Sequence, residues 1–220
     1  ERRVVRSGEV ALDIGANVGC YSSLLAQLVG RDGRVYAFEP NLRLVRLLNR
    51  LAKANPQLTV VHAGLSAEDG KAQFSIPENW ISGSFGNVDD AVEAHEVSLY
   101  ALDSFLEKQG LANVTFIKCD AEGAELDILI GAKRLLQSRK PPIWMLEMSS
   151  EETERFGYHP ARLVEYVVEV SENRYTILMI DQETGELKPI EMPSEEPFWF
   201  NAVFVPEWLY DRVRTRAGIG

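Results

Sequence analysis

Apolar residues along the chain fall into short continuous runs that alternate with segments of helical spacing. The run VALDI at residues 10–14 predicts a buried strand, and the helix predicted at residues 21–29 carries Leu24, Leu25 and Leu28 on one face. The same order repeats, with strands predicted at 34–40, 58–66, 114–120 and 141–149 and helices at 41–55 and 122–137. Strands separated by helices predict an α/β fold with a parallel, doubly wound sheet.

The last third of the chain has a different pattern. A helix is predicted at 160–171, followed by strands at 175–181, 186–191 and 198–205 with a turn at 183–185 between the first two. Two of these strands are expected to form an antiparallel edge. The interval 72–99 is the least regular part, and it predicts a long loop over the active face because long loops in compact domains are usually functional.

Composition narrows the possible functions. The chain has 220 residues, which suit a single domain over 1–220, and a net charge of −10 that repels phosphate backbones and anionic lipid, so a nucleic-acid substrate is disfavoured. No apolar run is long enough to span a membrane, and the opening ERRVVRSGEV lacks a signal-peptide core. Two cysteines, Cys20 and Cys119, favour reduced thiols and a cytoplasmic location.

The turn after the first strand predicts a ligand site. Gly15 and Gly19 bracket a sharp bend at a helix start, where free backbone N–H groups favour a polar or anionic ligand. Glu39 ends the second predicted strand, about 24 residues beyond Gly15, where a carboxylate accepts hydrogen bonds from ribose hydroxyls. A nucleoside-containing cofactor is therefore expected at the carboxyl edge of the sheet.

The glycine spacing bears on which cofactor binds. The third glycine of the dinucleotide fingerprint is missing and Asn17 replaces the second, so a pyrophosphate fits poorly and an NAD(P)-dependent oxidoreductase remains only an alternative. Asp13, two residues before the first glycine, suits a cofactor with a cationic end such as S-adenosylmethionine, because opposite charges attract strongly in a partly dry site.

Several segments resemble the FkbM family of S-adenosylmethionine-dependent methyltransferases. The matching pieces are LDIGANVGCYS, VYAFEPN, the AGLS segment, LDSFL and above all FIKCDAEGAELDILIGAKRLL. The resemblance implies a class I methyltransferase fold, Rossmann-like, with a seven-stranded mostly parallel sheet, an antiparallel last strand and helices on both faces. It also implies a cofactor site in which Glu39 contacts the ribose, Leu65 and Ser66 lie near the adenine, and the methionine part is lined by Asp13, Gly15, Asn17 and Gly19. Ala16, Tyr21 and Pro40 beside these residues complete the predicted cofactor site, together with Asp120.

The segment Asp120–Glu125 is the predicted catalytic edge. Asp120 ends a strand and Glu122 follows it, so both are candidate catalytic residues that orient an acceptor hydroxyl and take its proton. Glu125 is expected instead to stabilise a helix N-terminus. Lys118 shares a strand face with Asp120, and either a neutralising pair or a substrate contact is expected.

Two further interpretations concern the same edge. No metal is predicted, although Asp120 and Glu147 on neighbouring strands would suit Mg²⁺ if substrate hydroxyls and waters completed the shell. Trp80, Ser82 and Phe85 are candidate substrate residues that could stack on or hydrogen-bond a sugar, or else pack the loop onto the sheet.

Taken together, these features predict an O-methyltransferase that acts on a hydroxyl of a small molecule, sugar or glycan. The expected partners are that acceptor and a second copy of this chain in a homodimer. No binding of nucleic acid and no insertion into a membrane are expected. The alternative from another class is a non-catalytic S-adenosylmethionine-binding adaptor.

Overall fold

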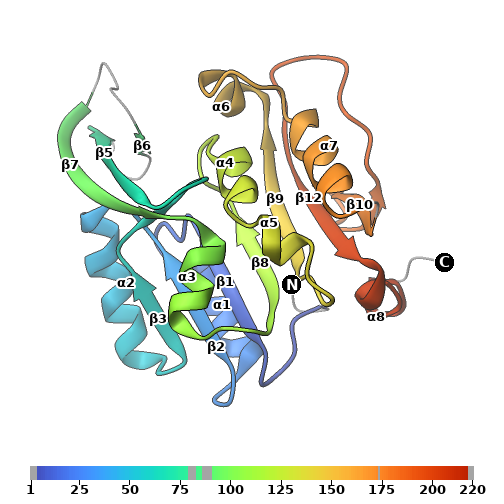
Figure 1. Ribbon diagram of the computed structural model, residues 1–220, viewed down its shortest axis with the longest axis horizontal. Coiled ribbons are helices and arrows are strands. Elements are labelled where there is room, and N and C mark those ends of the chain that lie inside the picture. Colours follow the sequence, from blue (N-terminus) through green and yellow to red (C-terminus); the bar gives the residue numbers. More distant parts are fainter. Residues whose placement is uncertain (1–3, 79–82, 86–90, 173, 218–220) are drawn as a thin grey trace.

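An eight-stranded sheet lies at the centre of the computed structural model, which describes residues 4–78, 83–85, 91–172 and 174–217 (Figure 1). Its strand order is β11-β10-β12-β9-β8-β1-β2-β3. The five strands that pair in parallel are β1 (Val10–Ile14), β2 (Arg34–Phe38), β3 (Leu58–Val61), β8 (Val114–Cys119) and β9 (Ile143–Ser149). The others are β10 (Tyr175–Ile180), β11 (Leu187–Pro189) and β12 (Trp199–Pro206).

The last strand confirms the predicted topology. Strand β12 inserts between β9 and β10 and runs antiparallel to both, as expected of a class I methyltransferase sheet. The short strand β11 pairs antiparallel with β10 and adds an eighth strand at that edge.

Helices cover both faces of the sheet (Figure 1). One face packs against α1 (Cys20–Val29), α2 (Leu42–Ala54) and α8 (Glu207–Ala217). The opposite face packs against α3 (Leu102–Gln109), α4 (Glu125–Ile130), α5 (Lys133–Leu136) and α7 (Ala161–Val170). Alternate strand residues supply the two cores, since Met145 and Val203 face the first group while Trp144 and Phe204 face the second. Within the described residues, no helix combines the length and apolar character needed to cross a membrane.

The long loop predicted at 72–99 is wrong over its described part. Strands β5 (Gly70–Pro77) and β7 (Ala91–Tyr100) pair antiparallel, and with β4 (Gly64–Leu65) and β6 (Ser84–Phe85) they form a second sheet of order β4-β7-β5-β6. The buried hydrophobic side chains of this sheet's small core are Phe74, Ile76 and Val97. Because much of β7 is exposed or half-buried, its sequence lacks the strict apolar alternation that predicts a strand.

The helix predicted at 122–137 begins later and is divided in two. Glu122 and Gly123 have φ angles of 55° and 101°, so the left-handed backbone at these positions delays α4 until Glu125. The helix is interrupted near Gly131, between α4 and α5, where a Cβ atom would lie 2.2 Å from the carbonyl oxygen of Ser66. A short helix that was not predicted, α6 (Ser150–Arg155), follows directly on β9.

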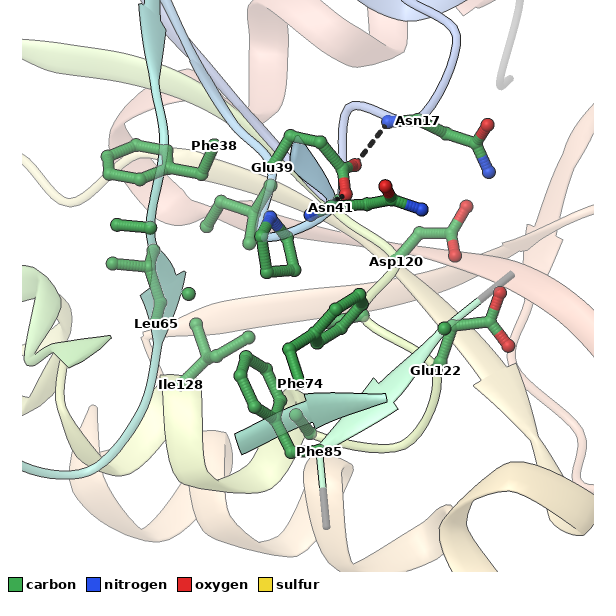
Figure 2. A pocket seen from close by; sticks show the side chains of 18 residues that line it. Asn17, Phe38, Glu39, Asn41, Leu65, Phe74, Phe85, Asp120, Glu122 and Ile128 are labelled. Atoms are coloured by element: carbon green, nitrogen blue, oxygen red, sulfur yellow. Dashed lines mark hydrogen bonds between the residues drawn. The ribbon is translucent and has the colours of Figure 1, made fainter. Parts of the chain in front are cut away.

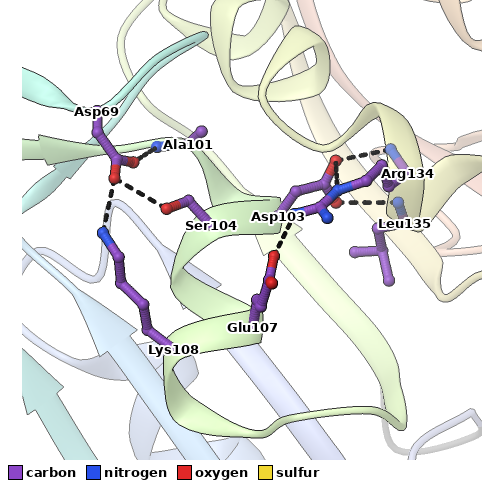
Figure 3. A network of polar contacts seen from close by, with 8 residues as sticks. All are labelled: Asp69, Ala101, Asp103, Ser104, Glu107, Lys108, Arg134 and Leu135. Carbon is purple, nitrogen blue, oxygen red and sulfur yellow. Dashed lines mark hydrogen bonds and ion pairs between the residues drawn. The ribbon is translucent and has the colours of Figure 1, made fainter.

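Two aspartates tie helix α3 to the segments that border the site (Figure 3). Asp69, just before β5, accepts hydrogen bonds from the Ala101 N–H, the Ser104 hydroxyl and the Lys108 ammonium, and these contacts, led by Lys108, lower the pKa of its carboxyl to about 2. Asp103 accepts from the backbone N–H groups of Arg134 and Leu135 at 2.6 and 2.9 Å, which caps helix α5 from outside. Helix α3 is therefore tied to the start of β5 on one side and to helix α5 on the other.

Candidate functional site

The glycine turn packs tightly between the ends of β2 and β8. The backbone N–H groups of Gly15 and Ala16 both donate to the Phe38 carbonyl, at 3.1 and 3.0 Å. Gly15 has a φ of 71°, and a Cβ atom there would lie 1.8 Å from the carbonyl oxygen of Asp120. Only glycine fits this position, since an added carbon would both strain the backbone and overlap the catalytic edge.

Glu39 is held by the backbone of two loops (Figure 2). Its Oε2 accepts from the Asn17 N–H and its Oε1 from the Asn41 N–H, each at 2.8 Å. Burial raises the pKa of this carboxyl to about 7, although the two N–H donors favour its ionised form. The Asn17 N–H is thus used to position a carboxylate, whereas a dinucleotide turn would offer it to a pyrophosphate.

A pocket opens between the turn and the second sheet. Its empty volume is about 660 Å³, which includes the space where it opens to solvent. Figure 2 shows Glu39 and Asn17 along one side, Phe74 and Phe85 opposite them, and Asp120 and Glu122 at one end. The predicted site residues that line it are Gly15, Asn17, Glu39, Pro40, Leu65, Phe85, Asp120 and Glu122. Sequence reasoning missed other lining residues, namely Ile14, Phe38, Asn41, Ala63, Gly64, Phe74, Gly83, Ala121, Ala124 and Ile128.

The other five predicted cofactor residues lie away from the pocket lining. Asp13, Ala16, Gly19, Tyr21 and Ser66 do not line the pocket. Of these, Asp13 is fully buried and Ser66 donates its N–H to the Tyr100 carbonyl. On the side of the glycine turn, the pocket is therefore lined by Ile14, Gly15 and Asn17, and Asp13 does not reach it.

Asp13 belongs to a buried network with Lys118. The Ser22 hydroxyl donates to Oδ2 of Asp13 at 2.5 Å, and the Lys118 ammonium lies 3.8 Å from Oδ1. That ammonium also lies 3.1 Å from Oδ2 of Asp120 and 5.3 Å from the centre of the Tyr21 ring. Burial disfavours the charged ammonium, but Asp13 and Asp120 together hold the pKa of Lys118 above its usual range. The neutralising pair of Lys118 with Asp120 is therefore formed.

Carboxyl groups gather where β8 and β9 end. Burial, together with the neighbouring carboxyls of Glu152 and Asp120, raises the pKa of Glu122 to about 7 and that of Glu147 to about 9. Glu152 of α6, which was not among the predicted site residues, contributes to both shifts. The raised pKa values make Glu122 and Glu147 easier to protonate near neutral pH than ordinary glutamates. Within the described residues, no set of three or more His, Cys, Asp or Glu side chains is arranged to hold a metal ion.

Contacts with Tyr158 and Glu152, and within the segment itself, hold Asp120–Glu125 in place. Oε1 of Glu125 accepts the Ala121 N–H at 2.6 Å, in keeping with a role at the helix start. The Tyr158 hydroxyl donates to the Gly123 carbonyl at 2.8 Å, and a Cβ atom on Gly123 would lie 2.5 Å from the Glu152 carbonyl oxygen. The left-handed backbone at Glu122 is thus fixed by its surroundings, which is typical of strained residues at functional sites.

The candidate substrate residues are only partly described. Trp80 and Ser82 lie outside the described residues. Phe85 meets Phe74 edge to face, with ring centres 5.1 Å apart, and a Cβ atom on Gly64 would lie 2.3 Å from its ring. Phe85 therefore covers the end of the pocket near Leu65, where the adenine is expected.

The sequence matches one protein family. The family model described as "Methyltransferase FkbM domain" covers residues 13–188. A curated relative, the AMB antimetabolite synthetase AmbE of Pseudomonas aeruginosa, is 28% identical over 160 residues, which is 56% of this chain and 8% of that protein. The chain thus spans a small part of this relative's length.

Solved structures share the fold. A methyltransferase FkbM from Methylobacillus flagellatus superposes with a TM-score of 0.57 at 18% identity, over 89% of this chain and 43% of that one. A candidate methyltransferase of Streptococcus mutans in complex with SAH gives 0.52 at 8% identity, over 92% and 91% of the two chains. An rRNA methylase from Streptococcus thermophilus gives 0.52 at 10% identity, over 93% and 90%. Likenesses at this level of identity establish the fold.

Proposed function

The chain belongs to the FkbM methyltransferase family, and from that premise we propose that it transfers a methyl group from S-adenosylmethionine to a hydroxyl of a small molecule, sugar or glycan. The observation that carries the proposal is one continuous pocket that joins Glu39 to Asp120 and Glu122. A carboxylate suited to bind ribose and a pair of acidic groups then line the same pocket, which supports a shared site for cofactor and acceptor.

The pocket residues fit the cofactor's parts. Glu39 offers carboxylate oxygens to ribose hydroxyls, and Leu65, Ile128 and Phe85 supply an apolar surface for an adenine ring. At the other end, the ion pair of Lys118 and Asp120 leaves Asp120 partly exposed beside the glycine turn, where the cationic end of the cofactor is expected. The donor set therefore suits a nucleoside with a positively charged tail.

Bound S-adenosylmethionine supplies a methyl group that is carried on a positively charged sulfur. The acceptor oxygen bonds to the methyl carbon as the carbon–sulfur bond breaks, and S-adenosylhomocysteine, whose sulfur is neutral, leaves. Asp120 and Glu122 orient the acceptor hydroxyl in line with that bond, and one of them receives the hydroxyl proton. Glu122 suits proton transfer near neutral pH, since burial and its acidic neighbours raise its pKa to about 7.

Calorimetry with S-adenosylmethionine, S-adenosylhomocysteine and NADP⁺ tests the cofactor. We expect the first two to bind and Glu39→Ala to weaken both at least tenfold, since it removes a charge-assisted contact to the ribose. Glu96→Ala, an exposed position in β7, is the matched control and should leave affinity unchanged. Absence of binding, or equal binding by Glu39→Ala, contradicts the assignment, and NADP⁺ binding alone would support an oxidoreductase.

Turnover is tested on a panel of hydroxylated acceptors by mass spectrometry. We expect methylated products from the wild type and a loss of kcat of about a hundredfold in Glu122→Gln, with cofactor affinity nearly unchanged. An EDTA-treated arm decides whether Asp120 and Glu147 require Mg²⁺. Cofactor binding without any turnover would instead support a non-catalytic adaptor.

A further inference from the structure

A second hollow lies beyond the catalytic edge, between the end of β9, helix α6 and the start of β12. It is lined by Glu147, Ser149, Glu151, Glu152, Pro197, Phe198 and Trp199. The antiparallel pairing of β9 with β12 places Trp199 opposite Ser149 and Asn201 opposite Glu147. Residues directly opposite one another project to the same side, so Trp199 and Glu147 share one face of the sheet. We call this hollow the acidic groove.

The acidic groove meets the cofactor pocket at a wall of carboxyl groups. Glu147 lines the groove, and the parallel register that pairs Cys119 with Leu146 places it next to Asp120, which lines the pocket. Glu152 of the groove lies against the segment that carries Glu122 of the pocket, since a Cβ atom on Gly123 would be 2.5 Å from the Glu152 carbonyl oxygen. A molecule lying in the groove can therefore reach the two groups proposed to orient the acceptor.

The chemistry of the groove selects a positive charge. Three of its lining side chains are glutamates, and no described lining residue is Lys, Arg or His. Burial and the neighbouring carboxyls of Asp120 and Glu152 raise the pKa of Glu147 to about 9, so a cation bound in the groove would relieve the repulsion between the charged forms of these groups.

The aromatic wall adds a second preference. Trp199 is 57% exposed, although it is a large apolar residue at the end of a strand. Phe198 beside it stacks on Phe200 at 5.9 Å between ring centres. An exposed indole face attracts cations and covers the apolar face of a sugar or an aromatic ring.

Building on the methyltransferase function proposed above, we propose that the acidic groove binds the ammonium group of an acceptor that carries an amine beside its hydroxyl, as amino sugars and amino alcohols do. The ammonium lies between Glu151, Glu152 and the Trp199 face, and the hydroxyl reaches Asp120 and Glu122. Because carboxylates keep the amine protonated, its nitrogen has no free electron pair, and the oxygen is the atom that is methylated.

Matched pairs of compounds test this directly. Glucosamine with glucose, and 2-aminocyclohexanol with 1,2-cyclohexanediol, differ mainly in the positive charge. Each is titrated by NMR into the protein with and without S-adenosylhomocysteine. We expect the cationic member of at least one pair to bind about tenfold more tightly, because it gains two charge contacts and one cation–π contact.

Variants assign the preference to the groove. Glu151→Gln, at an exposed position whose substitution is compatible with folding, should reduce the preference several-fold, and Trp199→Ala should weaken both members of the preferred pair. Glu154→Gln on the same helix does not line the groove and should change nothing.

Equal affinity within both pairs, no binding of either cation at about 10 mM, or a preference unchanged by Glu151→Gln would each overturn the proposal. The arm without S-adenosylhomocysteine reads the groove by itself. A failure of cofactor binding is therefore distinguishable from a failure of ammonium recognition.

Discussion

The ammonium of Lys118 lies 3.1 Å from Oδ2 of Asp120 and donates a hydrogen bond to the carbonyl of Gly15 at 2.9 Å. Its side chain is 4% exposed. One buried cation therefore joins the strand that ends at Asp120 to the glycine turn, and it lies 3.8 Å from Oδ1 of the buried Asp13.

Lys118→Met should strongly destabilise the protein. The substitution keeps the apolar stem but leaves Asp13 and Asp120 without their cation, and removing one partner of a buried pair typically costs about 3–5 kcal/mol. Urea unfolding measures the change. Lys71→Met, which breaks the exposed pair of Lys71 with Glu96, is the control and should have little effect. Similar stability in both variants would show that the buried pair is not required.

Gly15→Ala should be far more damaging than Gly8→Ala. Both glycines have positive φ angles, 71° and 83°, so both variants incur a left-handed backbone cost of about 1–2 kcal/mol. Only at Gly15 does the added Cβ meet another atom, 1.8 Å from the Asp120 carbonyl oxygen, whereas nothing lies within 4 Å at Gly8. Thermal unfolding of the two variants checks the difference, and equal losses would contradict the close approach of the turn to Asp120.

Cofactor affinity should fall in acid because of Glu39. The pKa of its carboxyl is raised to about 7, and the ionised form is the better acceptor for ribose hydroxyls. If the bound form is ionised, lowering the pH from 8 to 6 requires a proton to be released on binding and weakens S-adenosylmethionine binding about tenfold. Calorimetry across that range measures the slope.

A Glu39→Gln variant should bind weakly with a flat pH profile. Glu122 lines the same pocket and its pKa is also raised to about 7, so Glu122→Gln is the companion variant and should retain the slope. A slope that persists in Glu39→Gln and disappears in Glu122→Gln would contradict this prediction and assign the pH dependence to Glu122.

Asp103→Ala should destabilise the region around helix α5. The Asp103 carboxylate accepts the N–H groups of Arg134 and Leu135, which otherwise lack intrahelical partners, and loss of such a cap costs about 1 kcal/mol. Chemical denaturation measures the change, with Asp211→Ala on the exposed side of α8 as a near-neutral control. Equal effects would mean that Asp103 does not act as a cap.

Local sequence patterns were sufficient wherever burial leaves a strong periodic signal. The parallel strands follow from continuous apolar runs, and the helices between them follow from apolar residues at helical spacing. The antiparallel direction of the final strand was expected from the family resemblance. The pair β5–β7 was missed because its core is small and its outer face is wet, so apolar alternation is weak. The start of α4 was misplaced because left-handed geometry at Glu122 depends on Gly123, Tyr158 and Glu152 around it.

The sequence by itself determined the fold family, the glycine turn, and the carboxylates Glu39, Asp120 and Glu122 on one sheet edge, because these features are set by residues close together in the chain. Only the tertiary structure decided that Asp13 does not reach the pocket and that the acidic groove exists. The groove depends on β12 pairing with β9, which places Trp199 opposite Ser149 and on the same face as Glu147 across a long separation in sequence. Such contacts are formed by packing and hydrogen bonding across the whole sheet, and no local pattern encodes them.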